Sequence, residues 1–175
     1  MSNLPMVRTW YHGMIPFKDF PQEIHPERLW VLKQLGDPAG RRILDIGCGT
    51  HKTLPECTGV DVRPVTDYQA SMDDLPFPPE EFDVIISRHS FEHVLNPVLA
   101  LREWRRVIKP EGRVIIVIPD HGQVDTMQEA LSVGQHLHAY TMESFLDLVH
   151  YGRQFTISSL EVVLEQWSFG AVLTP

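Results

Sequence analysis

The pattern of apolar and polar positions along the chain predicts alternating strands and helices. Four short apolar segments have the length of core strands, at residues 43–46, 58–62, 82–87 and 113–118. The third and fourth are apolar runs without polar alternation, which is typical of parallel strands covered on both faces. We therefore expect helices on both sides of a central sheet.

The first predicted helix begins at Pro26, because proline suits the first helical position. Leu29, Leu32 and Leu35 fall on one face of this helix, which predicts that they are buried. Gly36 follows as a stop signal.

The second predicted helix follows Asn96, a good N-cap, and has Pro97 at its first position. Its predicted buried face consists of Val98, Leu101, Trp104 and Ile108. Residues 109–112 are expected to end it. The order strand, helix, strand predicts a right-handed crossover of a doubly wound sheet.

The last part of the chain predicts a helix and a hairpin. Thr141 can cap a helix that runs to Tyr151, with Phe145, Leu148 and Val149 inward and Gly152 as terminator. Strands at 156–164 and 167–173 follow. They are so close in sequence that they can only pair antiparallel. The expected fold is an open, mostly parallel α/β sheet with an antiparallel edge.

Length and charge narrow the functional classes. The 175 residues predict one domain over 1–175. The net charge of −8 disfavours a nucleic-acid or anionic-membrane partner, so a small-molecule substrate is expected, and a homodimer is left open. Residues 1–24, rich in aromatics and interrupted by prolines, predict an irregular arm that serves as a lid or as a plain structural segment.

Compartment and redox chemistry follow from what the sequence lacks. The longest aliphatic run, 114–118, is far too short to span a membrane, and no secretory leader is recognised. The two cysteines, Cys48 and Cys57, form no C-x-x-C pair. These features favour a cytoplasmic protein without disulfide bonds.

The clearest candidate site follows the first strand, at Asp45-Ile46-Gly47-Cys48-Gly49, where small residues let the backbone approach a ligand. Lys52 stands where a dinucleotide fingerprint would have its third glycine, which disfavours NAD or FAD. Asp61 ends the second strand, where its carboxylate can accept both hydroxyls of a ribose. The alternative for Asp61 is a turn-forming aspartate.

Five segments occur in order: ILDIGCG, GVD, DDLPFPPEEFDVIIS, FEHV and EWRRVIKPEGRVIIVIPD. They resemble the successive motifs of class I S-adenosylmethionine-dependent methyltransferases. The chain looks most like the type 11-like methyltransferases with a short GCGxxK loop. The resemblance covers about residues 40–120, and it implies a seven-stranded Rossmann-like sheet with a further strand near residues 68–70.

By this resemblance, the glycine turn borders the methionine and ribose portions of S-adenosylmethionine, and Asp61 holds the ribose hydroxyls. Ser71 stands where many relatives have an aspartate bonded to adenine, so that contact can pass to Asp73 or to backbone amides. The cofactor-binding set that we expect is Asp45, Gly47, Cys48, Gly49, Lys52, Asp61, Val62, Ser71, Met72, Asp73, Ser87 and Arg88.

The link between the glycine turn and Asp61 is short and contains Pro55, so the usual first helix must be a turn or lost. Such a helix normally presents its N-terminus to the cofactor carboxylate. Lys52 can replace that positive charge, or it can be a solvated loop residue. Both interpretations remain open.

No residue is singled out as a base. The loop candidates are His89, His121, His136 and His138, with Asp120 beside them, and each histidine can equally be a surface or capping residue. Phe91-Glu92-His93-Val94 is expected to shape its loop rather than act chemically. His136 and His138, one residue apart, lack a metal-ligand spacing, so no metal site is expected.

The leading hypothesis is therefore an enzyme that transfers a methyl group from S-adenosylmethionine to a small-molecule or glycan-like acceptor. The alternative is a protein of the same fold that binds the nucleoside without turnover, or that acts as a scaffold. An NAD-dependent reductase is a third hypothesis, disfavoured by Lys52.

Overall fold

The computed structural model describes residues 25–127 and 136–175. The predicted arm, 1–24, lies outside the described residues. The described elements, in chain order, are α2 (Pro26–Leu35), β1 (Ile43–Ile46), β2 (Thr58–Asp61), β3 (Tyr68–Gln69), β4 (Phe82–Arg88), the 3-10 helix η3 (Phe91–His93), α3 (Pro97–Val107), β5 (Ile108–Pro119), α4 (Met142–Gly152), β6 (Thr156–Leu164) and β7 (Ser168–Thr174).

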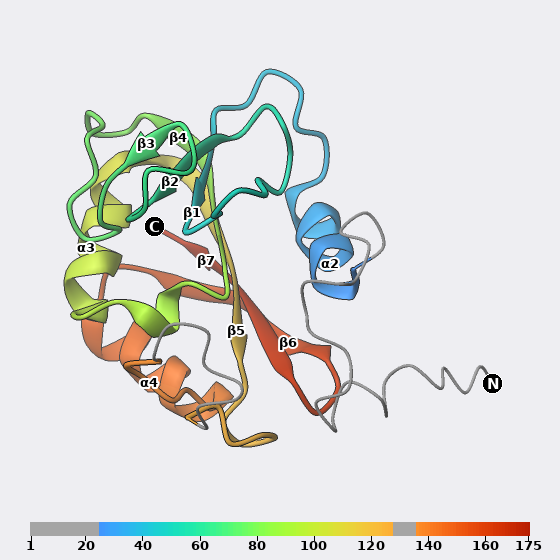
Figure 1. Cartoon of the computed structure of the whole chain (residues 1–175). Helices are drawn as coiled ribbons and strands as arrows, with labels where there is room; N and C mark the ends of the chain where they lie inside the picture. The colour runs from blue at the N-terminus through green and yellow to red at the C-terminus, as the bar shows by residue number, and fades with distance from the viewer. Residues whose placement is uncertain (1–24, 128–135) are drawn as a thin grey trace.

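The strands form one seven-stranded sheet in the order β3-β2-β1-β4-β5-β7-β6 (Figure 1). The strands from β3 to β5 pair in parallel, and β7 pairs antiparallel with both β5 and β6. This topology confirms the predicted doubly wound sheet with an antiparallel carboxyl-terminal hairpin. The order reverses between β1 and β4, which is where open sheets of this kind bind ligands.

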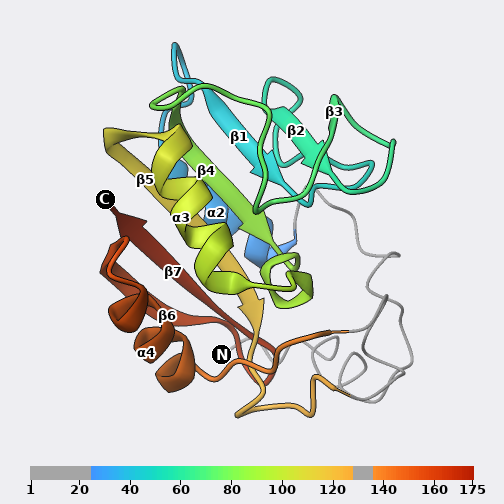
Figure 2. The same cartoon turned by 90° about the vertical axis from the view of Figure 1, so that its left-hand side faces the viewer.

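Helices cover both faces of the sheet, as predicted: α3 lies in front of it in Figure 2 and α2 behind it. Leu44 and Ile85 pack in the core cluster that contains Trp104 of α3. Their neighbour Ile43 belongs to a second cluster, with Val31 of α2. Because alternate strand residues enter the two clusters, both faces must be apolar, which explains the uninterrupted apolar runs.

Helix boundaries follow the predicted caps. The Asn96 side chain accepts a hydrogen bond of 3.2 Å from the Leu99 N–H at the start of α3. Thr141 and Ser144 form a reciprocal capping box on α4. Such side chains satisfy amides that a helix N-terminus leaves without partners.

No membrane-spanning helix occurs within residues 25–127 and 136–175, because the helices there are too short or too polar.

The predicted buried face of α2 is right in part. Leu35 is buried and Leu32 packs partly buried against the same cluster, but Leu29 is 49% exposed. The fully buried positions are Glu27, Val31 and Leu35, which are spaced by four. A glutamate takes the inward position because residues distant in sequence supply hydrogen bonds to it: His89 and Ser168 contact its two oxygens. Apolar periodicity cannot reveal such a partner.

Helix α3 ends at Val107, so residues 109–112 lie beyond its end, as predicted. The start of the next strand is corrected: β5 begins at Ile108, which was assigned to the helix, rather than at Arg113. Ile108 pairs with Phe82, and a register shift separates this pairing from that of Val84 with Arg113. An ion pair of 2.7 Å between Lys109 Nζ and Asp83 Oδ1 supports the added strand segment.

The carboxyl end of α4 differs from prediction by one residue. Gly152 is the last helical residue, and Arg153 has the left-handed conformation, with φ 52°.

A residue with a Cβ is strained in the left-handed conformation of Arg153 by about 1–2 kcal/mol. Arg153→Gly should therefore stabilise the fold by about 0.5–1 kcal/mol, after the entropy that glycine costs, and should raise Tm by roughly 2–4 °C in a thermal melt. Arg153→Ala keeps the Cβ, so an equal gain in that control would contradict the explanation.

Candidate functional site

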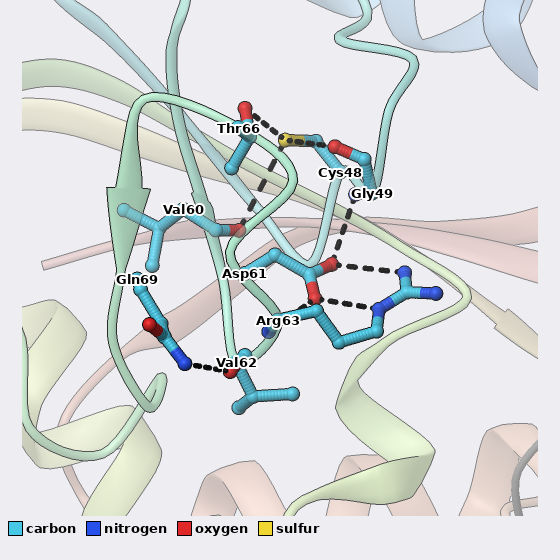
Figure 3. A network of polar contacts seen from close by, with 8 residues as sticks. All are labelled: Cys48, Gly49, Val60, Asp61, Val62, Arg63, Thr66 and Gln69. Atoms are coloured by element: carbon cyan, nitrogen blue, oxygen red, sulfur yellow. Dashed lines mark hydrogen bonds and ion pairs between the residues drawn. The ribbon is translucent and has the colours of Figure 1, made fainter.

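The carboxyl ends of β1 and β2 meet at the glycine turn. The Gly47 N–H donates to the Val60 carbonyl at 2.7 Å, and the Gly49 N–H donates to Asp61 Oδ2 at 2.9 Å (Figure 3). Residues 47–57 contain turns and bends but no helix, which confirms that the short link replaces the usual first helix. The turn and the carboxylate that the sequence predicts to act together are thus in direct contact.

Gly47 permits a close approach between the glycine turn and the loop after β4. Its φ is +70°, and a Cβ added there would lie 2.2 Å from the Cβ of Ser90. The Ser90 hydroxyl donates to the Ile46 carbonyl at 3.0 Å and lies 2.7 Å from the hydroxyl of Ser87. Ser87 is fully buried in this contact. Its hydroxyl therefore supports the turn rather than facing an open site.

Asp45 lies beneath the turn and is buried. Its Oδ2 accepts a hydrogen bond of 2.5 Å from the Thr53 N–H. Burial raises the pKa of the Asp45 carboxyl, although the Thr53 bond and the charges of Arg88 and Lys52 act in the opposite direction. Asp45 therefore holds the link between β1 and β2 in place.

Asp61 is held by Arg63, a partner that the sequence analysis did not predict. Arg63 Nε lies 2.9 Å from Asp61 Oδ1 and Nη2 lies 3.3 Å from Oδ2, so the guanidinium covers both oxygens (Figure 3). Burial alone would raise the pKa of Asp61, but the hydrogen bonds from Arg63 and Gly49 outweigh it and hold the pKa below its usual value. The Arg63 side chain is 66% exposed, so it can leave at small cost.

The residues expected around adenine lie along β2, β3 and the turn after them. Val62 follows Asp61, is 64% exposed, and its carbonyl accepts a hydrogen bond of 3.0 Å from Gln69 (Figure 3). The Ser71 hydroxyl donates to Asp73. The Met72 carbonyl accepts from Trp104 Nε1 at 3.0 Å, which ties this turn to α3.

Lys52 and Cys48 contact the loop between β2 and β3. Lys52 Nζ lies 2.9 Å from Asp67 Oδ2, and that same oxygen accepts from the Gly59 N–H at 2.8 Å. The ammonium is therefore engaged away from Asp45 and the glycine turn. Cys48 Sγ lies 3.4 Å from the Thr66 hydroxyl, and burial raises the pKa of the thiol. A protonated thiol packs here as a small, weakly polar side chain.

The histidine candidates lie in different surroundings. His89, directly after β4, has φ +50°, and its Nε2 lies 2.8 Å from Glu27 Oε2. His121 Nδ1 contacts the Thr126 hydroxyl at 3.1 Å. His138 Nε2 is bonded to the Val94 carbonyl at 2.8 Å. Of the four candidate bases, His89 makes the shortest contact with a carboxylate, whereas His121 Nδ1 lies 4.0 Å from Asp125 Oδ1 and His136 Nε2 lies 3.8 Å from Glu92 Oε1.

Glu27 is a buried site residue that the sequence pattern did not identify. The Ser168 hydroxyl donates to its Oε1 at 2.5 Å, while His89 contacts Oε2. Burial alone would raise the pKa of Glu27 and lower that of His89, but their mutual attraction dominates and shifts each pKa the other way. The two therefore form an ion pair beside the end of β4.

A second cluster surrounds Glu92 in η3. Phe91 is fully buried, as expected of a loop-shaping residue, but Glu92 is also buried and faces histidines. Its Oε1 lies 3.9 Å from His93 Nε2 and 3.8 Å from His136 Nε2. Burial raises the pKa of the Glu92 carboxyl and lowers that of His136. His138 lies outside this cluster, on Val94.

Comparisons with known proteins agree with this architecture. The model of a family described as methyltransferase domain matches residues 23–165. A Bacillus subtilis protein named uncharacterized methyltransferase YcgJ is 34% identical in an alignment over 107 residues, and the match covers 47% of this chain and 42% of that protein. The ubiquinone biosynthesis O-methyltransferase of Aeromonas salmonicida is 30% identical, over 61% of this chain and 55% of that one. The chain spans about half the length of the curated relatives that it matches.

A solved structure extends the likeness over nearly the whole fold. The Burkholderia thailandensis 1,6-didemethyltoxoflavin-N1-methyltransferase, solved with 1,6-didemethyltoxoflavin and S-adenosylhomocysteine, superposes with a TM-score of 0.68. The match covers 98% of this chain and 86% of that chain, at 16% identity, and it therefore shows the fold. Together with the family model, it shows that this chain belongs to the methyltransferase domain family, within the class I S-adenosylmethionine-dependent methyltransferases.

Proposed function

We propose that this chain transfers the methyl group of S-adenosylmethionine to a small-molecule acceptor. The observation that carries the proposal is the 2.9 Å contact between the Gly49 N–H and Asp61 Oδ2. It brings a flexible glycine turn and a ribose-binding carboxylate to the same edge of the sheet, at the reversal of strand order.

Each part of the cofactor has a suitable counterpart at this edge. Asp61 accepts the two ribose hydroxyls once Arg63 moves aside, so the ribose replaces one set of donors with another. The exposed side chain of Val62 offers an apolar surface to adenine. Arg88 and Lys52 both act electrostatically on Asp45, but Lys52 is paired with Asp67, so we assign the cofactor carboxylate to the positive charge of Arg88.

The acceptor is placed on the other side of the turn, beside the loop after β4. Methyl transfer is an in-line displacement at a carbon that the positive sulfur already activates, so the protein contributes alignment and exclusion of water. His89 and its partner Glu27 stand at this side. A small acceptor is supported by the names of two similar proteins, a ubiquinone biosynthesis O-methyltransferase and a 1,6-didemethyltoxoflavin-N1-methyltransferase.

A titration with S-adenosylhomocysteine tests the cofactor assignment. We expect binding well below about 1 mM, and at a hundredfold excess over Kd a stabilisation of about 2.7 kcal/mol. For a chain of this size, that raises Tm by roughly 5–10 °C. No binding and no change in Tm would refute the proposal.

Transfer itself is tested with S-adenosylmethionine labelled in its methyl group and a panel of phenolic, heterocyclic and glycan acceptors. Label in any product that depends on Asp61 supports an enzyme. Tight binding of S-adenosylhomocysteine without label in any product favours the non-catalytic alternative.

A further inference from the structure

The side chains around Glu92 converge on one carboxylate oxygen. Glu92 Oε1 lies 3.9 Å from His93 Nε2, 3.8 Å from His136 Nε2 and 3.8 Å from His89 Nδ1. The ligand atoms of Glu92, His93 and His136 all lie within 4.8 Å of one another. Three imidazole nitrogens thus lie at nearly equal distances from a single carboxylate oxygen.

These separations are too long for hydrogen bonds but suit a shared cation. Among the described residues, neither carboxylate oxygen of Glu92 has a hydrogen-bond partner, and the side chain is only 2% exposed. Burying a carboxylate without hydrogen-bond partners lowers the stability of the fold unless a positive charge contacts the carboxylate. Ligands placed 2.0–2.1 Å from a tetrahedral metal ion are about 3.3 Å apart. The two separations from Glu92 therefore need to shorten by about half an ångström, and no pair of ligand atoms, all within 4.8 Å of one another, by more than about 1.5 Å.

We propose that Glu92, His93 and His136 bind a divalent transition-metal ion of the Zn²⁺ type. Two imidazoles and one carboxylate are borderline donors that suit Zn²⁺ and its first-row neighbours, whereas Ca²⁺ and Mg²⁺ take sets of oxygen ligands. Three protein ligands leave at least one coordination position open, which is the arrangement of a reactive metal rather than a structural one.

The backbone holds the two contributing segments together without the metal. The N–H groups of Leu137 and His138 donate to the Glu92 carbonyl at 2.9 and 3.1 Å. The His138 side chain adds its bond to the Val94 carbonyl at 2.8 Å. The rings of His93 and His136 consequently lie edge to face, with centroids 4.8 Å apart. Three hydrogen bonds thus position His136 over the turn that carries the other two ligands.

The ion pair of His89 and Glu27 borders this cluster. Glu27 binds His89 Nε2, and this contact directs the other ring nitrogen, Nδ1, toward Glu92. A carboxylate that orients an imidazole beside a metal is a common supporting arrangement. His89 and Glu27 are therefore positioning residues for the cluster.

The proposed metal ion favours acceptors that carry a hydroxyl group. This inference about the acceptor rests on the proposed function. The cluster follows β4, which neighbours β1 and its glycine turn in the sheet. A hydroxyl group of the acceptor that binds the open position loses its proton to solvent more readily. The oxygen then attacks the methyl carbon: a C–O bond forms, the C–S bond breaks, and its electron pair returns to sulfur. The expected acceptors are phenols and other hydroxylated small molecules.

Metal binding can be measured without turnover. The purified full chain is stripped with a chelator and titrated with Zn²⁺ by calorimetry and with Co²⁺ by visible absorption. We expect one ion per chain, and d–d bands with the intensity of a four-coordinate site. His93→Ala and His136→Ala should each weaken Zn²⁺ binding by at least roughly tenfold. Glu92→Gln keeps the shape of the side chain and should also weaken it.

Matched controls separate this site from adventitious binding by histidines. His121→Ala and His150→Ala alter histidines outside the cluster and should leave the stoichiometry and affinity unchanged. Circular dichroism verifies that each variant is folded. If one of the three ligand variants is unfolded, the test uses the other two. The proposal is overturned if the stripped chain binds no Zn²⁺, or if folded His93→Ala, His136→Ala and Glu92→Gln bind it as the parent chain does.

The two proposals fail separately. Binding of S-adenosylhomocysteine without Zn²⁺ binding would reject the metal site and leave the cofactor site intact. Zn²⁺ binding without S-adenosylhomocysteine binding would do the reverse.

Discussion

Asp61→Ala is expected to weaken S-adenosylhomocysteine binding by roughly 5- to 150-fold, or about 1–3 kcal/mol, in a calorimetric titration. The substitution removes both ribose acceptors and the bond from the Gly49 N–H, which positions the glycine turn. Asp61→Asn keeps the size of the side chain but loses its charge, so its affinity should fall between those of the parent and the alanine variant.

Arg63→Ala is the matched control for Asp61. It removes the same ion pair but leaves the carboxylate, and an exposed pair of this kind contributes about 0.2–1 kcal/mol. Because Arg63 competes with the ribose for Asp61, its loss should leave S-adenosylhomocysteine affinity unchanged or tighten it by up to about fivefold. Unchanged affinity in Asp61→Ala would show that the ribose is held elsewhere. A large loss in Arg63→Ala would show that the arginine itself contacts the ligand.

Gly47→Ala should destabilise the protein by about 2–5 kcal/mol. The left-handed backbone costs about 1–2 kcal/mol for a residue with a Cβ, and crowding in a packed region adds about 1–3 kcal/mol. The crowding partner is Ser90, whose Cβ would lie 2.2 Å from the new methyl group. A fall in Tm of roughly 5–15 °C is expected in a thermal melt.

Gly36→Ala separates the two causes. Gly36 also has a positive φ, of +67°, but a Cβ there meets nothing within 4 Å. This control should therefore show only the backbone cost. Adding Ser90→Gly to Gly47→Ala removes the contact and should recover part of the lost stability. If Gly47→Ala and Gly36→Ala lower Tm equally, contact with Ser90 is not important.

Local patterns predicted most of the fold. Strands β1 and β6 begin and end at the predicted residues, and β4 extends one residue further, to Arg88. Apolar runs and caps depend on neighbours in sequence, so they can be interpreted without coordinates. The errors occurred where a distant partner decides the outcome. Glu27 occupies the inward face of α2 because of His89 and Ser168.

The candidate site, like the fold, was predicted from the sequence only in part. The glycine turn and Asp61 were predicted to act together, because the ends of neighbouring parallel strands lie at one edge of a sheet, and the structure shows them in direct contact. Arg63 was missed because an arginine two residues after the aspartate has many rotamers, of which only some reach back to it. Glu92 and His136 were not associated because their contact depends on how the segment before α4 folds over η3.

The sheet order has a consequence for how specificity can diversify. In the proposed function, most of the residues that hold the adenosyl group come from one continuous stretch, 45–73, whereas the acceptor side consists of Glu27 and a later stretch that begins at His89. The two stretches meet where β1 lies beside β4 and where Trp104 of α3 donates to the Met72 carbonyl. Mutation, insertion or recombination in the later stretch can therefore change the molecule that is methylated while the machinery for holding the methyl donor is inherited unaltered.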